Sequence, residues 1–171
     1  MDTVISAAAT LKGIENLLIV FVGDGSEVPH LKKLVDSYGL EEMVQFIGRK
    51  PIEDIPAYLA SADALLVHLK PSPLSDFVIP YKTTAYLVVG KPILMATGGA
   101  AGELIEEIGS GITIEPGDPA TMSRAMREFL SMQSDTIDDM GEKGRDYFLS
   151  QLSKGVVIPL YEGLLKDAME K

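Results

Sequence analysis

The sequence predicts an α/β domain built on one Rossmann-like parallel sheet with helices on both faces. Short continuous apolar runs, typical of strands buried on both faces, recur along the chain. Stretches with helical spacing of apolar residues lie between these runs, and glycine or proline marks most of the boundaries. Because strands that alternate with helices are joined by right-handed crossovers, we expect these strands to run parallel.

The predicted elements begin with a helix rather than a strand. The run 17–22 is interpreted as a strand buried on both faces, and Ser26 as the cap of the helix after it. A chain that starts inside a helix is unusual for this fold, so we expect the first strand of the sheet to be lacking. The other predicted strands are 44–47, 64–69, 92–96 and 112–114; the predicted helices are 3–11, 27–38, one from Pro51, one from Pro80 to Gly90, 103–108, 120–130, 137–149 and about 156–169, with 133–139 as a polar connector.

The composition indicates a single domain over residues 1–171 and excludes several classes of protein. With 46% apolar residues the chain can build one core. Its net charge of −10 argues against nucleic acid as a partner, since phosphate contacts are made by lysine and arginine. Cysteine is absent from the sequence, and His30 and His68 are far apart in it, so neither thiolates nor a histidine cluster indicate a metal. We expect no metal and no cofactor.

Polar and glycine residues follow several of the predicted strands, at the edge where ligands of such sheets bind. Thr83 and Thr84 begin a helix beside Lys82, and a helix N-terminus attracts anions through its free N–H groups. Arg49 suits a phosphate or a base carbonyl, and carboxylates can hold sugar hydroxyls. Tight turns and solvated charges explain the same residues without a ligand. The candidate site residues at this edge are Gly23, Gly25, Gly48, Arg49, Lys50, Asp76, Tyr81, Lys82, Thr83, Thr84 and Glu103.

Three familiar motifs are not met. Gly23-Asp24-Gly25 has no third glycine three residues on, because Val28 stands there, so the dinucleotide fingerprint is incomplete. The sequence holds no phosphate-binding loop of the nucleoside-triphosphatase type. Ser72 and Ser75 have no nucleophile-elbow pattern, and nothing supports hydrolytic chemistry.

Taken together, the segments resemble the C-terminal domain of GT-B fold glycosyltransferases, in particular family 4, also called group 1. The resemblance covers about residues 2–170 and rests on an ordered series rather than on one motif. A helix followed by Gly90-Lys91-Pro92 looks like the alanine-rich helix and Gly-x-Pro turn of the family. The series comprises LIVFVGDG at 18–25, VQFIGR at 44–49, IPAYLASADALLV at 55–67, YLVVGKPIL at 86–94, ELIEEIGSG at 103–111 and PGDP at 116–119.

The chain departs from the family at its usual pair of glutamates, eight positions apart. Aligned on Gly90 and Pro92, these fall on Phe77 and Ala85, and neither is a carboxylate. The subgroup of bacterial aminosugar transferases has Pro-Ser-Lys followed by a carboxylate and Tyr. Here Pro80, Lys82 and Tyr86 are kept and Tyr81 replaces Ser. Loss of the ribose-binding Glu implies altered donor binding, a substitute such as Asp76, or lost transferase activity.

The resemblance implies transfer of a sugar from a nucleotide-sugar, UDP-linked, to a cell-surface saccharide or lipid-linked acceptor. By it, Gly48 and Arg49 would hold the base, Lys82 with Thr83 and Thr84 the diphosphate, and Asp76 and Glu103 the ribose or sugar. An N-terminal acceptor domain of the same protein would complete the cleft, so we expect no turnover by this domain alone. Retaining or inverting chemistry and oligomeric state stay open.

We expect a cytoplasmic location, since no signal peptide or membrane-length apolar run is present; peripheral attachment at the inner membrane face stays open. A non-catalytic scaffold module of the same fold is the main alternative. A flavodoxin-like receiver is a third, but it needs an acidic cluster after its first strand, which the sequence does not show.

Overall fold

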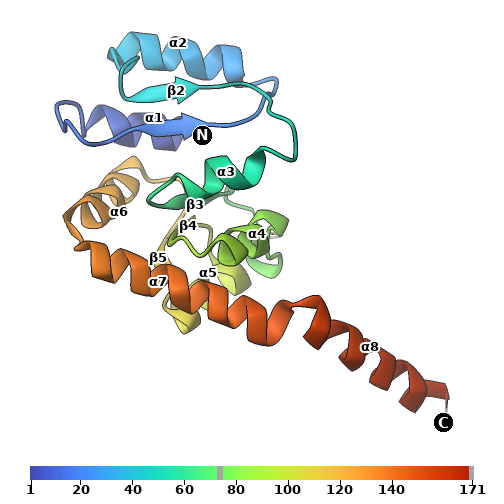
Figure 1. The fold of residues 1–171 in the computed structure, drawn as a ribbon. Coiled ribbons are helices and arrows are strands. Elements are labelled where there is room, and N and C mark those ends of the chain that lie inside the picture. The colour runs from blue at the N-terminus through green and yellow to red at the C-terminus, as the bar shows by residue number, and fades with distance from the viewer. Residues whose placement is uncertain (73–74, 170–171) are drawn as a thin grey trace.

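The computed structural model describes residues 1–72 and 75–169; Pro73, Leu74 and residues 170–171 lie outside the described residues. Eight α-helices and five strands are described (Figure 1). The strands are β1 Ile19–Phe21, β2 Val44–Phe46, β3 Leu65–His68, β4 Ile93–Ala96 and β5 Gly111–Ile114. The helices are α1 Asp2–Ala9, α2 Val28–Tyr38, α3 Ile55–Ala60, α4 Tyr81–Val89, α5 Gly99–Ile108, α6 Pro119–Ser131, α7 Ser134–Tyr147 and α8 Lys154–Met169, with a 3-10 turn at Ser75–Phe77 and a π-helical segment at Phe148–Leu152.

The strands run parallel as predicted, but they form two sheets rather than one. β1 pairs with β2 in the register Ile19 opposite Val44. β3, β4 and β5 form the second sheet in that order, with Leu65 opposite Ile93 and Ile93 opposite Gly111. Among the described strands none joins β1 to β3. The predicted parallel strands are confirmed, and among the described residues they are divided between these two sheets.

Helices cover both faces of the second sheet, as expected. On one face, Leu94 and Ala96 of β4 pack under α1 and α6. On the other face, Ile93 and Met95 pack with Leu87 of α4 and with α5. A third cluster joins α1 to α2 and β2. The cluster under α1 and α6 also takes in Ile19 and Phe21 of β1, so one core connects the two sheets.

The run 17–22 is not buried on both faces, and this prediction is wrong. Ile19 and Phe21 face the core, and the Phe21 ring stacks on Phe46 with centroids 4.9 Å apart. Leu18, Val20 and Val22 alternate with them and keep 54%, 42% and 39% of their surface exposed. Strand side chains point to opposite faces in turn, so one whole face of β1 is open.

The turn between α4 and β4 has the form that the sequence indicates. Gly90 closes α4 in the left-handed conformation, with φ of 75°, a common helix ending. Gly141 of α7 lies directly against it: a β-carbon at position 141 would overlap the carbonyl oxygen of Gly90. The α4–β4 turn is therefore held under α7 at a contact with no room for a side chain.

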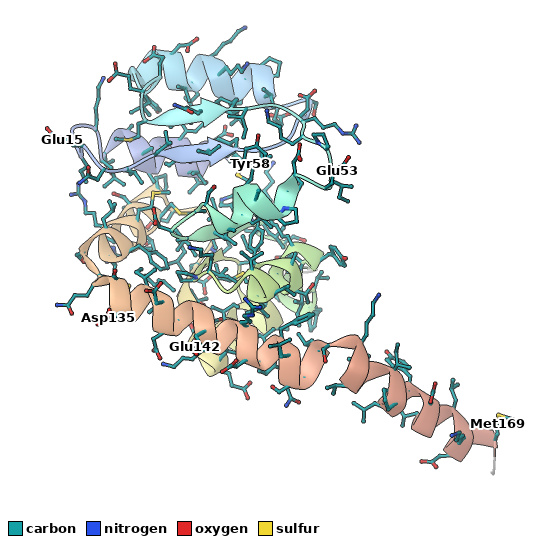
Figure 2. The ribbon with its side chains drawn as sticks, viewed as in Figure 1. Glu15, Glu53, Tyr58, Asp135, Glu142 and Met169 are labelled. Carbon is teal, nitrogen blue, oxygen red and sulfur yellow. The ribbon has the colours of Figure 1, made fainter. Side chains whose placement is uncertain are left out.

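Several helix boundaries differ from the predicted ones. α5 begins at Gly99, four residues early, and α7 begins at Ser134, so the expected polar connector is helical. Neither Ser26 nor the start of α1 supplies a side-chain cap, and Pro80 is the residue before α4 rather than its first turn. α8 has no buried residue and extends away from the body, with Met169 at its far end (Figure 2). In the part of the chain that is described, no helix has both the length and the apolarity to span a bilayer.

Candidate functional site

The loops after β1 and β2 meet at the carboxyl edge of their sheet. The Gly23 N–H donates to the Gly48 carbonyl at 2.9 Å. Both glycines have positive φ, 132° and 69°, and a β-carbon on either would meet no atom within 4 Å. Gly25 also borders open space, and its N–H donates to the Asp24 carboxylate at 2.8 Å. Three predicted glycines thus form one backbone surface that a ligand can approach closely.

The two basic residues after Gly48 differ in their surroundings. Arg49 is exposed, with its guanidinium free to reach an anion at this edge. Lys50 is half-buried, and its Nζ lies 5.7 Å from the ring centroid of Tyr58 on α3. A cation over an aromatic face is attracted by the ring quadrupole, so Lys50 is directed toward α3.

The N-terminus of α4 does not present the pair of hydroxyls that the sequence suggested. Thr84 Oγ1 donates to the Tyr81 carbonyl at 2.8 Å, so this hydroxyl serves the helix itself. Thr83 is fully buried, and its Oγ1 has no hydrogen-bond partner among the described residues. Its N–H donates to the Pro80 carbonyl at 2.8 Å. The backbone N–H groups of Tyr81 and Lys82 therefore remain for an anion at this terminus.

Lys82 is the half-buried cation of this terminus. Burial lowers the pKa of Lys82 below its ordinary value. His68, at the end of β3, also has a lowered pKa, first because of burial, then because of the positive charges of the Met1 amino group and Lys82. Its Nε2 is unpartnered among the described residues. An anion here would relieve the cost of placing positive charge in partly desolvated surroundings.

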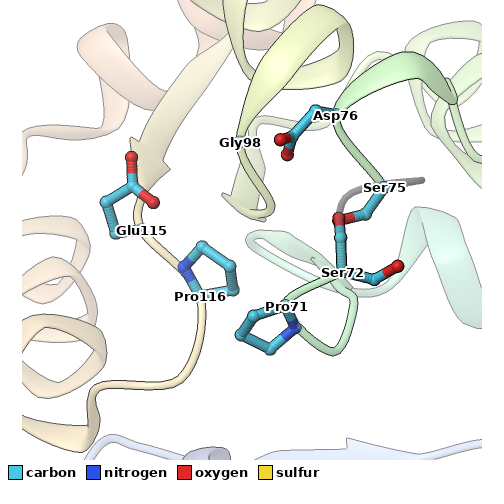
Figure 3. A pocket seen from close by; sticks show the side chains of 7 residues that line it. All are labelled: Pro71, Ser72, Ser75, Asp76, Gly98, Glu115 and Pro116. Carbon is cyan, nitrogen blue, oxygen red and sulfur yellow. The ribbon is translucent and has the colours of Figure 1, made fainter.

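A cavity of about 480 Å³ is formed by the loops after β3, β4 and β5. Asp76 and Glu115 face it from opposite sides, with Gly98 between them (Figure 3). A β-carbon on Gly98 would lie 3.6 Å from Asp76 Oδ1 and 3.9 Å from Glu115 Oε2. Two carboxylates that face one cavity suit the hydroxyls of a sugar and disfavour a phosphate. The other residues that line the cavity are Pro71, Ser72, Ser75 and Pro116.

Only one of the two predicted sugar-binding carboxylates borders this cavity. Asp76 does, whereas Glu103 is exposed in the second turn of α5 and is not among the lining residues. Glu115 was missed by sequence reasoning. Its signal was its place directly after β5, the same position relative to a strand that drew attention to the other loops.

Comparison with known proteins shows the family to which this chain belongs. The family model of glycosyl transferases group 1 matches residues 1–147, and the chain belongs to this family. A putative colanic acid biosynthesis glycosyltransferase, WcaL of Salmonella typhimurium, is 25% identical over 126 residues, 73% of this chain and 31% of that protein. The chain thus spans about a third of the length of that curated relative.

Solved structures show the same fold. Anabaena Alr3699/HepE in complex with UDP superposes with a TM-score of 0.78 at 20% identity, over 99% of this chain and 44% of that one. The C-terminal domain of a glycosyl transferase group 1 family protein, LpcC of Francisella tularensis, gives 0.73 at 18% identity, over 91% of this chain and 79% of that domain. The chain has the C-terminal half of a GT-B fold, as the sequence predicted.

Proposed function

We propose that this chain is the nucleotide-sugar-binding domain of a glycosyltransferase that takes a UDP-linked sugar. The observation that carries the proposal is Lys82, a half-buried cation beside free N–H groups of α4 at the carboxyl edge of the sheet. Family membership supports a transferase, and the fold it shares with HepE, which is solved with UDP, supports the nucleotide.

The loops at the carboxyl edge of the sheet present different groups to the diphosphate, the base and the sugar of the donor. Lys82 and the first N–H groups of α4 would bind the diphosphate and stabilise the negative charge that grows on it as the sugar leaves. The Gly48 backbone and Arg49 would hold the base. Asp76 and Glu115 would accept hydrogen bonds from hydroxyls of the sugar in the 480 Å³ cavity.

The acceptor chemistry is proposed from the relatives. WcaL is a putative colanic acid biosynthesis enzyme, so we propose a saccharide or lipid-linked acceptor in cell-surface polysaccharide synthesis. The acceptor would bind to an N-terminal domain of the same protein. We expect this domain alone to bind the donor without transferring its sugar.

Titration with UDP, UDP-glucose and GDP tests the donor assignment, followed by ligand-observed NMR where affinity is weak. UDP is expected to bind, and Lys82→Ala to weaken it about 10- to 100-fold, the cost of a charge-assisted contact. Lys91→Ala is the matched control: Lys91 precedes β4, at the opposite edge of the sheet, and its loss is expected to leave affinity unchanged. No binding at millimolar UDP or GDP would refute the proposal, and equal effects of the two variants would refute the diphosphate assignment.

A non-catalytic binding module is the second candidate, favoured by Ala85. Ala85 lies on α4, at the position where the resemblance to the family implies a ribose-binding glutamate. To distinguish a transferase from a binding module, the acceptor domain is added and the release of UDP from UDP-sugars is measured. Donor binding without sugar transfer or hydrolysis favours the scaffold, and Ala85→Glu would then be expected to strengthen UDP binding.

A further inference from the structure

A run of apolar residues, Phe77-Val78-Ile79-Pro80-Tyr81, links the 3-10 turn to α4 and lies largely in solvent. Phe77 and Tyr81 keep 83% and 89% of their surface exposed, and Val78 and Ile79 keep 41% and 45%. Single exposed apolar side chains are common on protein surfaces, whereas a contiguous group of them marks a site of interaction. We call residues 77–81 the apolar run.

Both ends of the apolar run are held by the fold. Before it, the N–H and Oγ of Ser75 both donate to the Ser72 carbonyl, at 2.9 and 2.6 Å. The Val78 N–H donates to the Ser75 carbonyl at 3.4 Å. At its end, the Pro80 carbonyl accepts a hydrogen bond from the Thr83 N–H at 2.8 Å, in the first turn of α4. The exposed side chains therefore belong to an anchored segment.

A second cavity, of about 250 Å³, adjoins the apolar run. It is lined by Leu69, Lys70, Ser72, Ser75 and Val78, and its lining is mainly apolar. Leu69 and Val78 supply aliphatic walls, and the Ser75 hydroxyl already donates to a backbone carbonyl. Because Val78 belongs to both, the second cavity and the apolar run form one continuous apolar surface.

This apolar surface adjoins the site that we assign to the donor. The second cavity shares Ser72 and Ser75 with the 480 Å³ cavity that Asp76 and Glu115 face. Asp76 directly precedes the apolar run, and Lys82 directly follows it. An occupant of the apolar surface is therefore held next to the position proposed for the donor sugar, where an acceptor has to meet it.

We propose that the second cavity and the apolar run bind the hydrocarbon chain of a lipid-linked acceptor. This rests on the proposed function and selects one of the two acceptor classes named there. Hydrocarbon fits because the apolar run carries no charged residue and Leu69, Val78 and Ile79 are aliphatic. A sugar ring is recognised through hydrogen bonds to its hydroxyls, and the carboxylates that suit them face the other cavity.

A single hydrocarbon chain, rather than a bilayer surface, is the occupant that the charge of the protein favours. The protein has a net charge of −10, and Asp76 adds an acidic group directly beside the apolar run. An anionic membrane would repel both. A cavity also encloses one chain, whereas a bilayer is bound by protruding side chains alone.

Alkyl β-D-glucosides with methyl, butyl, hexyl and octyl chains test the proposal on the 171-residue protein, below the concentrations at which they form micelles. Each methylene removed from water is expected to raise the affinity about two- to fourfold until the cavity is full. NMR signals of the Leu69, Val78 and Ile79 methyl groups are expected to shift. Equal affinity for the methyl and octyl glucosides, or shifts confined to Leu160 and Leu164 of α8, overturns the proposal.

Val78→Asp places a charge in the apolar wall and is expected to remove the dependence on chain length. Val88→Asp is the matched control, because Val88 is 42% exposed on α4 but does not line the cavity. If Val78→Asp does not fold, Phe77→Ser replaces it, since that side chain lies in solvent, and a several-fold loss of octyl glucoside affinity is expected. Unchanged affinity in the folded variants overturns the proposal.

Titration of the same samples with UDP separates this proposal from the proposed function. UDP binding without any dependence on chain length overturns the hydrocarbon site alone. Dependence on chain length without UDP binding refutes the donor site, and with it the role of the hydrocarbon site in acceptor binding. Sedimentation with phosphatidylcholine vesicles, or dimer formation, that Phe77→Ser abolishes would assign the surface to a bilayer or to a second copy. Either result overturns the proposed occupant.

Discussion

The α-carbon of Gly99 lies directly against the backbone of Asp76. Gly99 has φ of +63°, and a β-carbon there would overlap the carbonyl oxygen of Asp76. This contact fixes the start of α5 against the 3-10 turn at Ser75–Phe77, and it sets the position of the Asp76 carboxylate beside the cavity. Gly98, one residue earlier, has an ordinary φ of −79° and room for a methyl group.

Gly99→Ala is therefore expected to destabilise the fold. Backbone overlap and the left-handed φ together should lower the free energy of unfolding by about 2–4 kcal/mol. Gly98→Ala should change it by less than about 1 kcal/mol. Urea denaturation of both variants is the measurement. Equal stability of the two would mean that the Asp76 turn moves aside readily.

Gly98→Ala has a different expected effect, on the sugar. Its methyl group would stand 3.6–3.9 Å from the two carboxylate oxygens, in the space that we assign to sugar hydroxyls. It should weaken UDP-glucose binding several-fold and leave UDP binding unchanged. Calorimetry with both ligands tests this. A parallel loss for UDP would place the nucleotide, rather than the sugar, in the cavity.

Gly141→Ala is expected to loosen the turn between α4 and β4. The added methyl group meets the Gly90 carbonyl across a contact with no spare room, which should cost about 1–3 kcal/mol of unfolding free energy. Gly155→Ala on α8 is the matched control, since its methyl group would meet nothing within 4 Å. It should be neutral or slightly stabilising. Thermal unfolding of both variants, followed by circular dichroism, makes the comparison.

Diphosphate binding is expected to take up protons through Lys82. In the free chain burial depresses the pKa of Lys82, so the charged form of Lys82 destabilises the folded state. This destabilisation decreases as the pH rises above the folded-state pKa, because Lys82 then loses its proton. A bound anion favours the charged form and raises the pKa again. Between the free and bound values, binding should add protons and affinity should fall as pH rises.

Calorimetry in buffers of different ionisation enthalpy measures this uptake. Lys82→Ala should abolish it at alkaline pH. His68, whose pKa is also lowered, would contribute at lower pH, and His68→Gln removes that part. If Lys82→Ala still takes up protons on binding at alkaline pH, the assignment of Lys82 to the diphosphate is wrong.

Local sequence signals located the carboxyl-edge loops well. Gly90 and Pro92 marked the α4–β4 turn because each residue has few alternative uses in that position. The glycines of the first two loops were found for the same reason, but their mutual hydrogen bond depends on strand register. Glu115 looked like any acidic loop residue, and only the fold brings it opposite Asp76.

Burial was harder to predict because it depends on neighbours that a local pattern does not contain. The apolar run 17–22 fits a central strand, yet the Val20 side chain lies on the face of β1 that stays exposed. Thr83 and Thr84 are adjacent at a helix start, but helix geometry sends one hydroxyl inward and the other to a backbone carbonyl. Sequence periodicity predicts the type of each element but not which of its side chains are buried.

Ser153 separates the π-helical segment Phe148–Leu152 from α8, and its backbone is extended, with ψ of 153°. The Ser153 carbonyl accepts hydrogen bonds from the N–H groups of Val156 and Val157, so a new helix begins there and α7 does not set its direction. Buried Gly141 and Gly144 mark the inner side of α7. The exposed Leu160, Leu164 and Leu165 of α8 therefore do not continue that inner side. A break of one residue is therefore enough to direct the apolar side chains of α8 independently of the core.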